Sequence, residues 1–212
     1  MKCVVTDYVE PDLAWEATKY QEAGIAFEAH QMRGAASGQL VSILHNADVI
    51  VVDQARIDRA VIARLDECKL IIRHGDGYDN VDFEAATDFG VVVANKPGFW
   101  SQEVAELAFS LSLAILRRIP LQQQIAASHN AEEGRWDLSR AMPQHRLGDV
   151  TVGGLGFGRI GRRVSNLLGS VCSEVLVHDP FLQEAQIVRA GARPATWETL
   201  LNESDLVTIH VP

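Results

Sequence analysis

The chain is poor in cysteine and in long apolar runs, and each shortage excludes a class of protein. Its three cysteines, Cys3, Cys68 and Cys172, are widely spaced and form no CxxC pair, which argues against a disulfide framework and against a thiolate metal site. No stretch approaches the roughly 18 apolar residues of a membrane helix, and the N-terminus lacks the apolar centre of a signal peptide. We therefore expect a cytoplasmic protein without a metal and without a membrane partner.

Positive charge is also scarce. The chain has 19 basic and 28 acidic residues and a formal net charge of −9. Nucleic acids and anionic membranes select for a positive protein surface, so direct binding to either is not expected. With 212 residues, 47% of them apolar and 22% charged, the composition is that of a globular protein with one or two domains. Small-molecule chemistry is the expected function.

Short β-rich apolar runs alternate with amphipathic stretches, a pattern that predicts an α/β fold with parallel sheets and crossover helices. Apolar residues at Ile57, Val61, Ile62 and Leu65 indicate one helix, and another, over Phe83–Phe89, is expected to stop at Gly90. The expected strands before the first break cover residues 3–6, 25–29, 49–52, 70–73 and 91–94.

Asn95–Gly98 contains Pro and Gly and marks a break, so we expect one domain over residues 1–98 and a second over 99–212. The second begins with a predicted helix over 101–118, with Ser101 as its N-cap. That helix is apolar over most of its circumference and is expected to lie between domains or to form a homodimer contact. An irregular surface connection is expected over residues 132–147.

The motif that carries chemistry is GxGxxG, at Gly156, Gly158 and Gly161. A β-branched run precedes it and a helical pattern follows, as dinucleotide sites require. The first glycine permits the turn, the second lets the backbone approach a pyrophosphate, and the third lets the helix pack on the strand. A second expected strand, Val175–His178, ends at Asp179, about 20 residues on, where a carboxylate meets the ribose hydroxyls.

These residues together predict an NAD site. The backbone N–H groups of Arg159 and Ile160 would point at the phosphates at the start of the helix. Asp179 would repel a 2′-phosphate, which favours NAD over NADP. The alternative is a glycine-rich turn without a cofactor, in which Asp179 caps a helix.

The residues also resemble a known family. Lys69–Asp82, Asn95–Gly98, Glu103–Glu106, Asp179–Pro180 and Ser204–Pro212 look like the corresponding segments of the D-isomer-specific 2-hydroxyacid dehydrogenases. Within the family, the chain is most similar to the branch that holds phosphoglycerate dehydrogenases and C-terminal-binding-protein-like members. The resemblance covers nearly the whole chain.

The resemblance implies a flavodoxin-like substrate domain, here residues 1–98 without its C-terminal return segment. An incomplete doubly wound Rossmann NAD-binding domain, residues 99–212, would follow, with the active site in the cleft between the two. It also implies that the last strand lies under the adenosine, which adds His210 and Pro212 to the cofactor-binding residues.

The resemblance further implies where a 2-hydroxy or 2-keto acid binds. Family members hold its carboxylate with backbone N–H groups of the loop that matches Gly75, Asp76 and Gly77, and in some branches with an arginine that matches Arg73. Asp76 departs from the family pattern, because its carboxylate would repel that of the substrate. Either its side chain points away or the substrate differs. The alternative for Arg73 is a strand-end salt bridge with Asp76 or Asp79.

The family's catalytic His, Glu and Arg follow the strand that ends this sequence, so no catalytic residue is expected within it. We expect a fragment that binds NAD at most. His74 and His210 are the possible substitutes for the acid/base, but neither has an evident orienting partner in the sequence.

Three functions fit these observations. The first is an NAD-dependent oxidoreductase of the D-2-hydroxyacid dehydrogenase type. The second is an NAD(H)-sensing dimeric protein that acts like a corepressor, and the third is a short paralogue that binds nucleotide weakly without chemistry.

Overall fold

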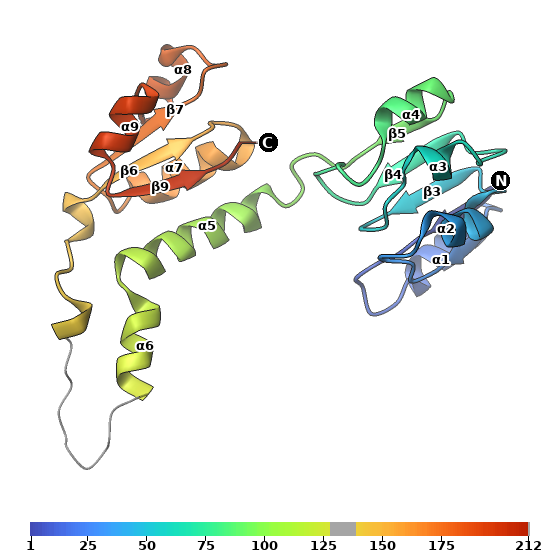
Figure 1. The fold of residues 1–212 in the computed structure, drawn as a ribbon, viewed down its shortest axis with the longest axis horizontal. Helices are drawn as coiled ribbons and strands as arrows, with labels where there is room; N and C mark the ends of the chain where they lie inside the picture. The colour runs from blue at the N-terminus through green and yellow to red at the C-terminus, as the bar shows by residue number, and fades with distance from the viewer. Residues whose placement is uncertain (128–138, 212) are drawn as a thin grey trace. The chain divides into compact units, whose positions relative to one another are not determined.

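The computed structural model describes residues 1–127 and 139–211. It divides into two compact units, Met1–Phe99 and Trp100–Pro212, each built on its own parallel sheet (Figure 1).

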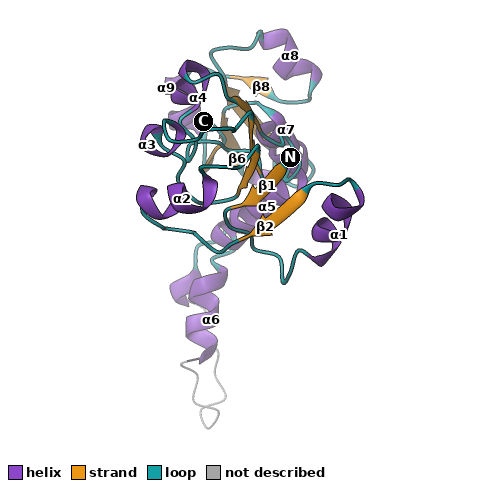
Figure 2. Ribbon diagram, turned by 90° about the vertical axis from the view of Figure 1, so that its right-hand side faces the viewer, coloured by secondary structure: helices purple, strands orange, loops and turns teal. Residues whose placement is uncertain are grey.

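The first unit is a five-stranded sheet in the order β2-β1-β3-β4-β5, with every neighbouring pair parallel. Figure 2 shows β1 and β2 side by side at one end of it. The order 2-1-3-4-5 is that of flavodoxin-like sheets and confirms the predicted fold class for this unit. Its strands are β1 (Lys2–Val5), β2 (Ala26–Ala29), β3 (Val49–Val52), β4 (Leu70–Arg73) and β5 (Val92–Ala94). Its helices are α1 (Ala14–Glu22), α2 (Ser37–Leu44), α3 (Arg59–Ile62) and α4 (Phe83–Asp88).

The core of this unit joins the central strands to the helices. Val4, Ile50 and Ile71, one from each of β1, β3 and β4, are fully buried against Leu40 and Leu44 of α2. The middle of the sheet is therefore filled by core packing, so a ligand could approach it only at the amino or carboxyl ends of its strands.

Two predicted helices in this unit have different outcomes. α4 is followed by Gly90 at φ +72°, as predicted. The helix predicted from Ile57 to Leu65 is wrong at both ends, because α3 covers only Arg59–Ile62. Ile57 instead forms a β-bridge with Val81, and the Asp58 carboxylate caps α3 by accepting from Val61 N–H at 3.0 Å.

The second unit is a four-stranded parallel sheet in the order β8-β7-β6-β9. This is the order 3-2-1-4 with which a Rossmann sheet opens, and it confirms the predicted fold class. Its strands are β6 (Thr151–Leu155), β7 (Glu174–His178), β8 (Arg193–Pro194) and β9 (Leu206–Ile209). Its helices are α5 (Ser101–Leu116), α6 (Ile119–Ala127), α7 (Arg159–Gly169), α8 (Glu184–Arg189) and α9 (Trp197–Glu203).

The long helix of this unit differs from its prediction. Trp100 holds the capping position and Ser101 is already helical and buried, so the predicted Ser101 N-cap is wrong. A helical Ser101 cannot turn its hydroxyl onto the first free N–H groups. α5 ends at Leu116, and α6 leaves it at an angle after Arg118 at φ +50° (Figure 1).

Of the predicted irregular segment 132–147, residues 132–138 lie outside the described residues. The remainder contains short 3-10 turns at Ser139–Ala141 and Leu147–Asp149. Across the described ranges, every helix is too short or too polar to cross a membrane.

Candidate functional site

The glycine turn after β6 is forced by close backbone packing. Gly156 has φ +83°, and a Cβ there would lie 2.6 Å from the carbonyl oxygen of His210. A Cβ on Gly161 would collide with the carbonyl oxygen of Gly156. Side chains at either position would therefore push apart the strand, the turn and the first residues of α7.

Gly158 is different, because no heavy atom lies within 4 Å of the place where its Cβ would stand. It is exposed, has φ −73°, and is the capping residue of α7. The protein itself thus gives no steric reason for a glycine there. The open space lies at the start of an 11-residue helix, where the first N–H groups, including those of Arg159 and Ile160, lack partners within the helix. Such a helix start favours an anion.

Asp179 lies against this turn. Its Oδ2 accepts from Phe157 N–H at 2.8 Å, and its Oδ1 accepts from Phe181 N–H at 3.0 Å. The structure therefore brings Asp179 and the glycine turn together. The next helix, α8, has Gln183 as its capping residue, so Asp179 does not cap that helix.

His210 reaches the turn through its backbone. Its N–H donates to the Leu155 carbonyl at 2.8 Å, and its own carbonyl is the atom that Gly156 packs against. The imidazole Nε2 lies 2.9 Å from Thr208 Oγ1, and burial lowers the pKa of this histidine. Pro212, the other predicted residue from this segment, lies outside the described residues.

A cavity of about 540 Å³ opens beside Asp179, between the ends of β7 and β8. On its wall, His178 Nδ1 lies 3.0 Å from the Ala195 carbonyl, and the imidazole meets the Trp197 ring edge-on. Sequence reasoning did not predict this cavity, because it depends on the pairing of β7 with β8.

The loop after β4 in the first unit is fixed by Asp76. The Asp76 Oδ2 accepts from Gly98 N–H at 2.9 Å, and its carbonyl accepts from Asn95 Nδ2 at 2.7 Å. The Gly75 carbonyl accepts from Lys96 N–H at 2.9 Å. The Asp76 side chain is therefore turned toward the backbone of Gly98. This is the first of the two predicted possibilities, that the side chain points away. Gly77 is exposed in the same loop.

Arg73 ends β4 and folds over Gly75. Its Nη1 donates to the His74 carbonyl at 3.1 Å and fills the space that a Cβ on Gly75 would need. Its Nε is buried and has no hydrogen-bond partner. Among the described residues no carboxylate lies within ion-pair distance of this guanidinium, so the predicted salt bridge with Asp76 or Asp79 is wrong.

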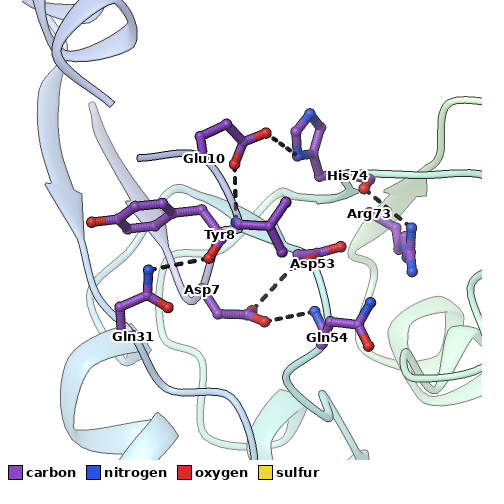
Figure 3. A network of polar contacts seen from close by, with 9 residues as sticks. Asp7, Tyr8, Glu10, Gln31, Asp53, Gln54, Arg73 and His74 are labelled. Atoms are coloured by element: carbon purple, nitrogen blue, oxygen red, sulfur yellow. Dashed lines mark hydrogen bonds and ion pairs between the residues drawn. The ribbon is translucent and has the colours of Figure 1, made fainter. Parts of the chain in front are cut away.

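Sequence reasoning missed the acidic residues at the carboxyl ends of β1 and β3 (Figure 3). Asp7 is 3% exposed. Its carboxylate accepts from the backbone N–H groups of Asp53, Gln54 and Ala55 and from the Thr6 hydroxyl, at 2.7–3.2 Å. The available signal was that Asp7 and Asp53 each come within two residues of a buried apolar strand.

Comparison with known proteins extends over both units. The family model described as D-isomer specific 2-hydroxyacid dehydrogenase, catalytic domain, matches residues 3–204. A D-3-phosphoglycerate dehydrogenase from Archaeoglobus fulgidus is 33% identical over 205 residues, which are 96% of this chain and 38% of that protein. A hydroxypyruvate reductase from Thermotoga maritima is 33% identical over 82% of this chain and 54% of its own length.

A solved structure agrees. The NAD-dependent formate dehydrogenase from Staphylococcus aureus in complex with NAD is 27% identical, with a TM-score of 0.82 over 100% of this chain and 65% of that one. The chain thus spans less than two thirds of the relatives that it matches.

Proposed function

Because the chain belongs to the D-isomer specific 2-hydroxyacid dehydrogenase family, we propose that it is part of an NAD-dependent oxidoreductase that interconverts a 2-hydroxy acid and its 2-keto acid. Residues 1–98 would hold the substrate and residues 99–212 the cofactor. Bound NAD supplies the hydride acceptor, and NADH the donor, for C2 of the substrate.

The open space at Gly158 carries the cofactor half of the proposal. A pyrophosphate there would receive the N–H groups of Arg159 and Ile160 at the positive end of α7. Gly156 and Gly161 hold that helix start against the sheet, and the backbone of His210 closes the turn behind it. Pro212 would complete the wall under the adenosine.

Asp179 supports NAD over NADP. Its carboxylate is held beside the turn by two backbone N–H groups and keeps further acceptor capacity for ribose hydroxyls. A 2′-phosphate in that place would meet a like charge.

Arg73 and the loop of Gly75, Asp76 and Gly77 would receive the substrate carboxylate. The buried Nε of Arg73 has no partner among the residues that the structure describes, and a carboxylate is the ligand that a guanidinium binds best. Because the Asp76 carboxylate is engaged with Gly98 N–H, the loop offers backbone N–H groups rather than a facing charge. The family's catalytic His, Glu and Arg match no residue of Met1–Pro212.

The exposed apolar stripe on α5 supports a homodimer. Val104, Leu107, Leu111 and Ile115 are 42–62% exposed and follow helical spacing along one face, while another face of α5 packs on α7. A continuous stripe of this kind is typical of self-complementary contacts. Leu111→Glu should shift sedimentation toward the monomer, and Ser110→Glu, one residue off the stripe, should not.

The same stripe also fits the second candidate function, that of an NAD-sensing dimer that acts like a corepressor. Sedimentation with and without NAD separates the two. Assembly that requires NAD would favour the sensor, and assembly that ignores NAD would remove its basis.

The cofactor half is tested by titrating NADH into wild type and into Gly158→Ala. The new methyl meets no protein atom but occupies the expected pyrophosphate approach, so the Kd should rise at least about tenfold with unchanged stability. Gly148→Ala, which also meets nothing within 4 Å in the same unit, is the matched control. Equal NADH affinity in all three proteins would contradict the proposal.

A further inference from the structure

Asp53 is a largely buried residue whose carboxylate has no hydrogen-bond partner among the described residues. It follows β3 and is 8% exposed. Its backbone is fully used, since its N–H donates to Asp7 and its carbonyl accepts from Asn80 Nδ2. Its carboxylate accepts no hydrogen bond from any described residue. Its oxygens are not among the fully buried atoms that lack a partner, so they contact solvent and keep acceptor capacity for a positively charged or hydrogen-donating ligand.

The nearest strand supplies an unsatisfied donor but no ion pair. Val52 and Arg73 are register partners in β3 and β4, and His74 N–H donates to the Val52 carbonyl at 2.8 Å. Asp53 and Arg73 are therefore at neighbouring strand ends, and in Figure 3 the Asp53 carboxylate points toward the side where Arg73 lies. Arg73 nevertheless keeps its Nη1 on the His74 carbonyl and its buried Nε without a partner.

A second carboxylate lies at the same edge. Glu10 Oε1 is 3.9 Å from His74 Nδ1, and Glu10 Oε2 accepts from Val9 N–H at 3.1 Å (Figure 3). Asp7, by contrast, is fully engaged by backbone donors and the Thr6 hydroxyl. Asp53 and Glu10 are thus two anions of this edge that keep acceptor capacity.

Two other cations of this edge have partners elsewhere. Arg33 donates to Gln54 Oε1 at 3.2 Å, and the Lys96 ammonium lies 3.4 Å from the centre of the Phe99 ring. On adjacent strands, this edge therefore combines a buried guanidinium N–H and a solvent-contacting carboxylate of a largely buried residue, and neither has a hydrogen-bond partner among the described residues.

We propose that the substrate is a 2-hydroxy or 2-keto acid whose side chain carries a positive charge, an ammonium or a guanidinium. This rests on the proposed function. Arg73 receives the substrate carboxylate, Asp53 receives the cationic end, and Glu10 adds to the negative potential. A second anionic group, such as the phosphate for which the D-3-phosphoglycerate dehydrogenases among the relatives are named, would face Asp53 and Glu10 and be repelled.

Three 2-hydroxy acids of matched length test this: 6-amino-2-hydroxyhexanoate, 2-hydroxyhexanoate and 2-hydroxyadipate, all as D-isomers. Each is titrated into the full chain with saturating NAD at low salt, and binding is measured by calorimetry. The cationic acid should bind at least about tenfold more tightly than the neutral one, and the dianionic acid most weakly. Equal affinities, or the reverse order, would overturn the inference, and so would a lack of binding by all three.

Substitutions test which residues cause the preference for the cationic acid. Asp53→Asn, which keeps the shape of the side chain, should make the cationic and neutral acids bind alike, and Glu10→Gln should reduce the preference by a smaller factor. Glu67→Gln removes one exposed carboxylate just before β4, at the opposite edge of the sheet, and should leave the preference unchanged. A preference that survives in both Asp53→Asn and Glu10→Gln would overturn the inference.

Binding of NADH, titrated separately from the hydroxy acids, distinguishes this inference from the proposed function. Charge-selective binding of the acids by a protein that binds no NADH would uphold the inference and count against the proposed cofactor site. Binding of NADH without any charge preference among the acids would support the cofactor site and overturn the inference.

Discussion

The two sheets of the molecule share a parallel α/β design but differ at their carboxyl edges. The first unit places charged side chains there, among them Asp53 and Arg73, whereas the second places glycines and backbone N–H groups around Gly158. Ligands of open α/β sheets bind at this edge in general. Under the proposed function, one architecture would support two kinds of recognition, by side-chain charge in one unit and by backbone donors in the other.

Gly161 and Gly75, one at each of these edges, must be glycine for different reasons. At Gly161 an added methyl would strike the carbonyl of Gly156, which is backbone and cannot move alone. At Gly75 the added methyl would strike the end of the Arg73 side chain, which has other rotamers. The first glycine is therefore required by the fold and the second by the position of Arg73.

The largest expected effect is that of Gly161→Ala. Forcing α7 away from the turn should lower the free energy of unfolding by about 3 kcal/mol, measured by urea denaturation. Gly148→Ala, whose methyl has free space, should stay within about 0.5 kcal/mol of wild type. A Gly161→Ala protein as stable as its control would refute the account of the tight turn.

Asp7→Asn comes next. This change replaces a buried acceptor of three backbone N–H groups by an amide that places a donor among them, at a cost of about 2 kcal/mol. Glu67→Gln, an exposed change in the same unit, is the control in denaturation measurements. Equal stabilities would show that the end of β3 does not depend on Asp7.

Gly75→Ala should separate binding from stability. Because the methyl displaces only the Arg73 guanidinium, the free energy of unfolding should change by less than about 1 kcal/mol, while the affinity for 2-hydroxyhexanoate should fall to that of Arg73→Met. An affinity equal to that of wild type would mean that the observed position of Arg73 is not the one that binds substrate.

The smallest effect concerns pH and the second unit. Burial lowers the pKa of His210, so below its ordinary value of about 6.5 the unfolded chain binds a proton that the folded protein resists. This contribution to stability is complete above that value and is lost as the pH falls from there through the lowered pKa. His210→Gln should flatten the fall in stability between pH 7 and pH 5, and an unchanged slope would contradict this.

The candidate site residues of the second unit could be predicted from the sequence far better than those of the first unit. The glycine turn and Asp179 are encoded by local spacing, so their contact could be expected before the structure. Asp7 meets the end of β3 across 46 to 48 positions, and that contact depends on the pairing of β1 with β3, which no local pattern encodes. The unpartnered states of Asp53 and Arg73 follow from the same pairings.

The wrong predictions were local choices that tertiary contacts reversed. Ser101 is a good capping residue by type, but it is buried and lies within the helix, with Trp100 at the capping position. The helix predicted from Ile57 ended early because Ile57 found a strand-like partner in Val81. In both cases packing between segments outweighed a preference of a few tenths to about 1 kcal/mol.

The central claim is that the second unit binds the cofactor and the first unit binds the hydroxy acid. Amide chemical shifts in a ¹⁵N-labelled protein test this most directly. Adding NADH should shift the amides of Gly158, Arg159 and Ile160 and leave those of Gly75 and Gly77 in place. Adding 6-amino-2-hydroxyhexanoate to the NAD-saturated protein should then shift Gly75, Gly77 and the Arg73 side-chain Nε. NADH shifts confined to the first unit, or hydroxy-acid shifts confined to the second, would contradict the account.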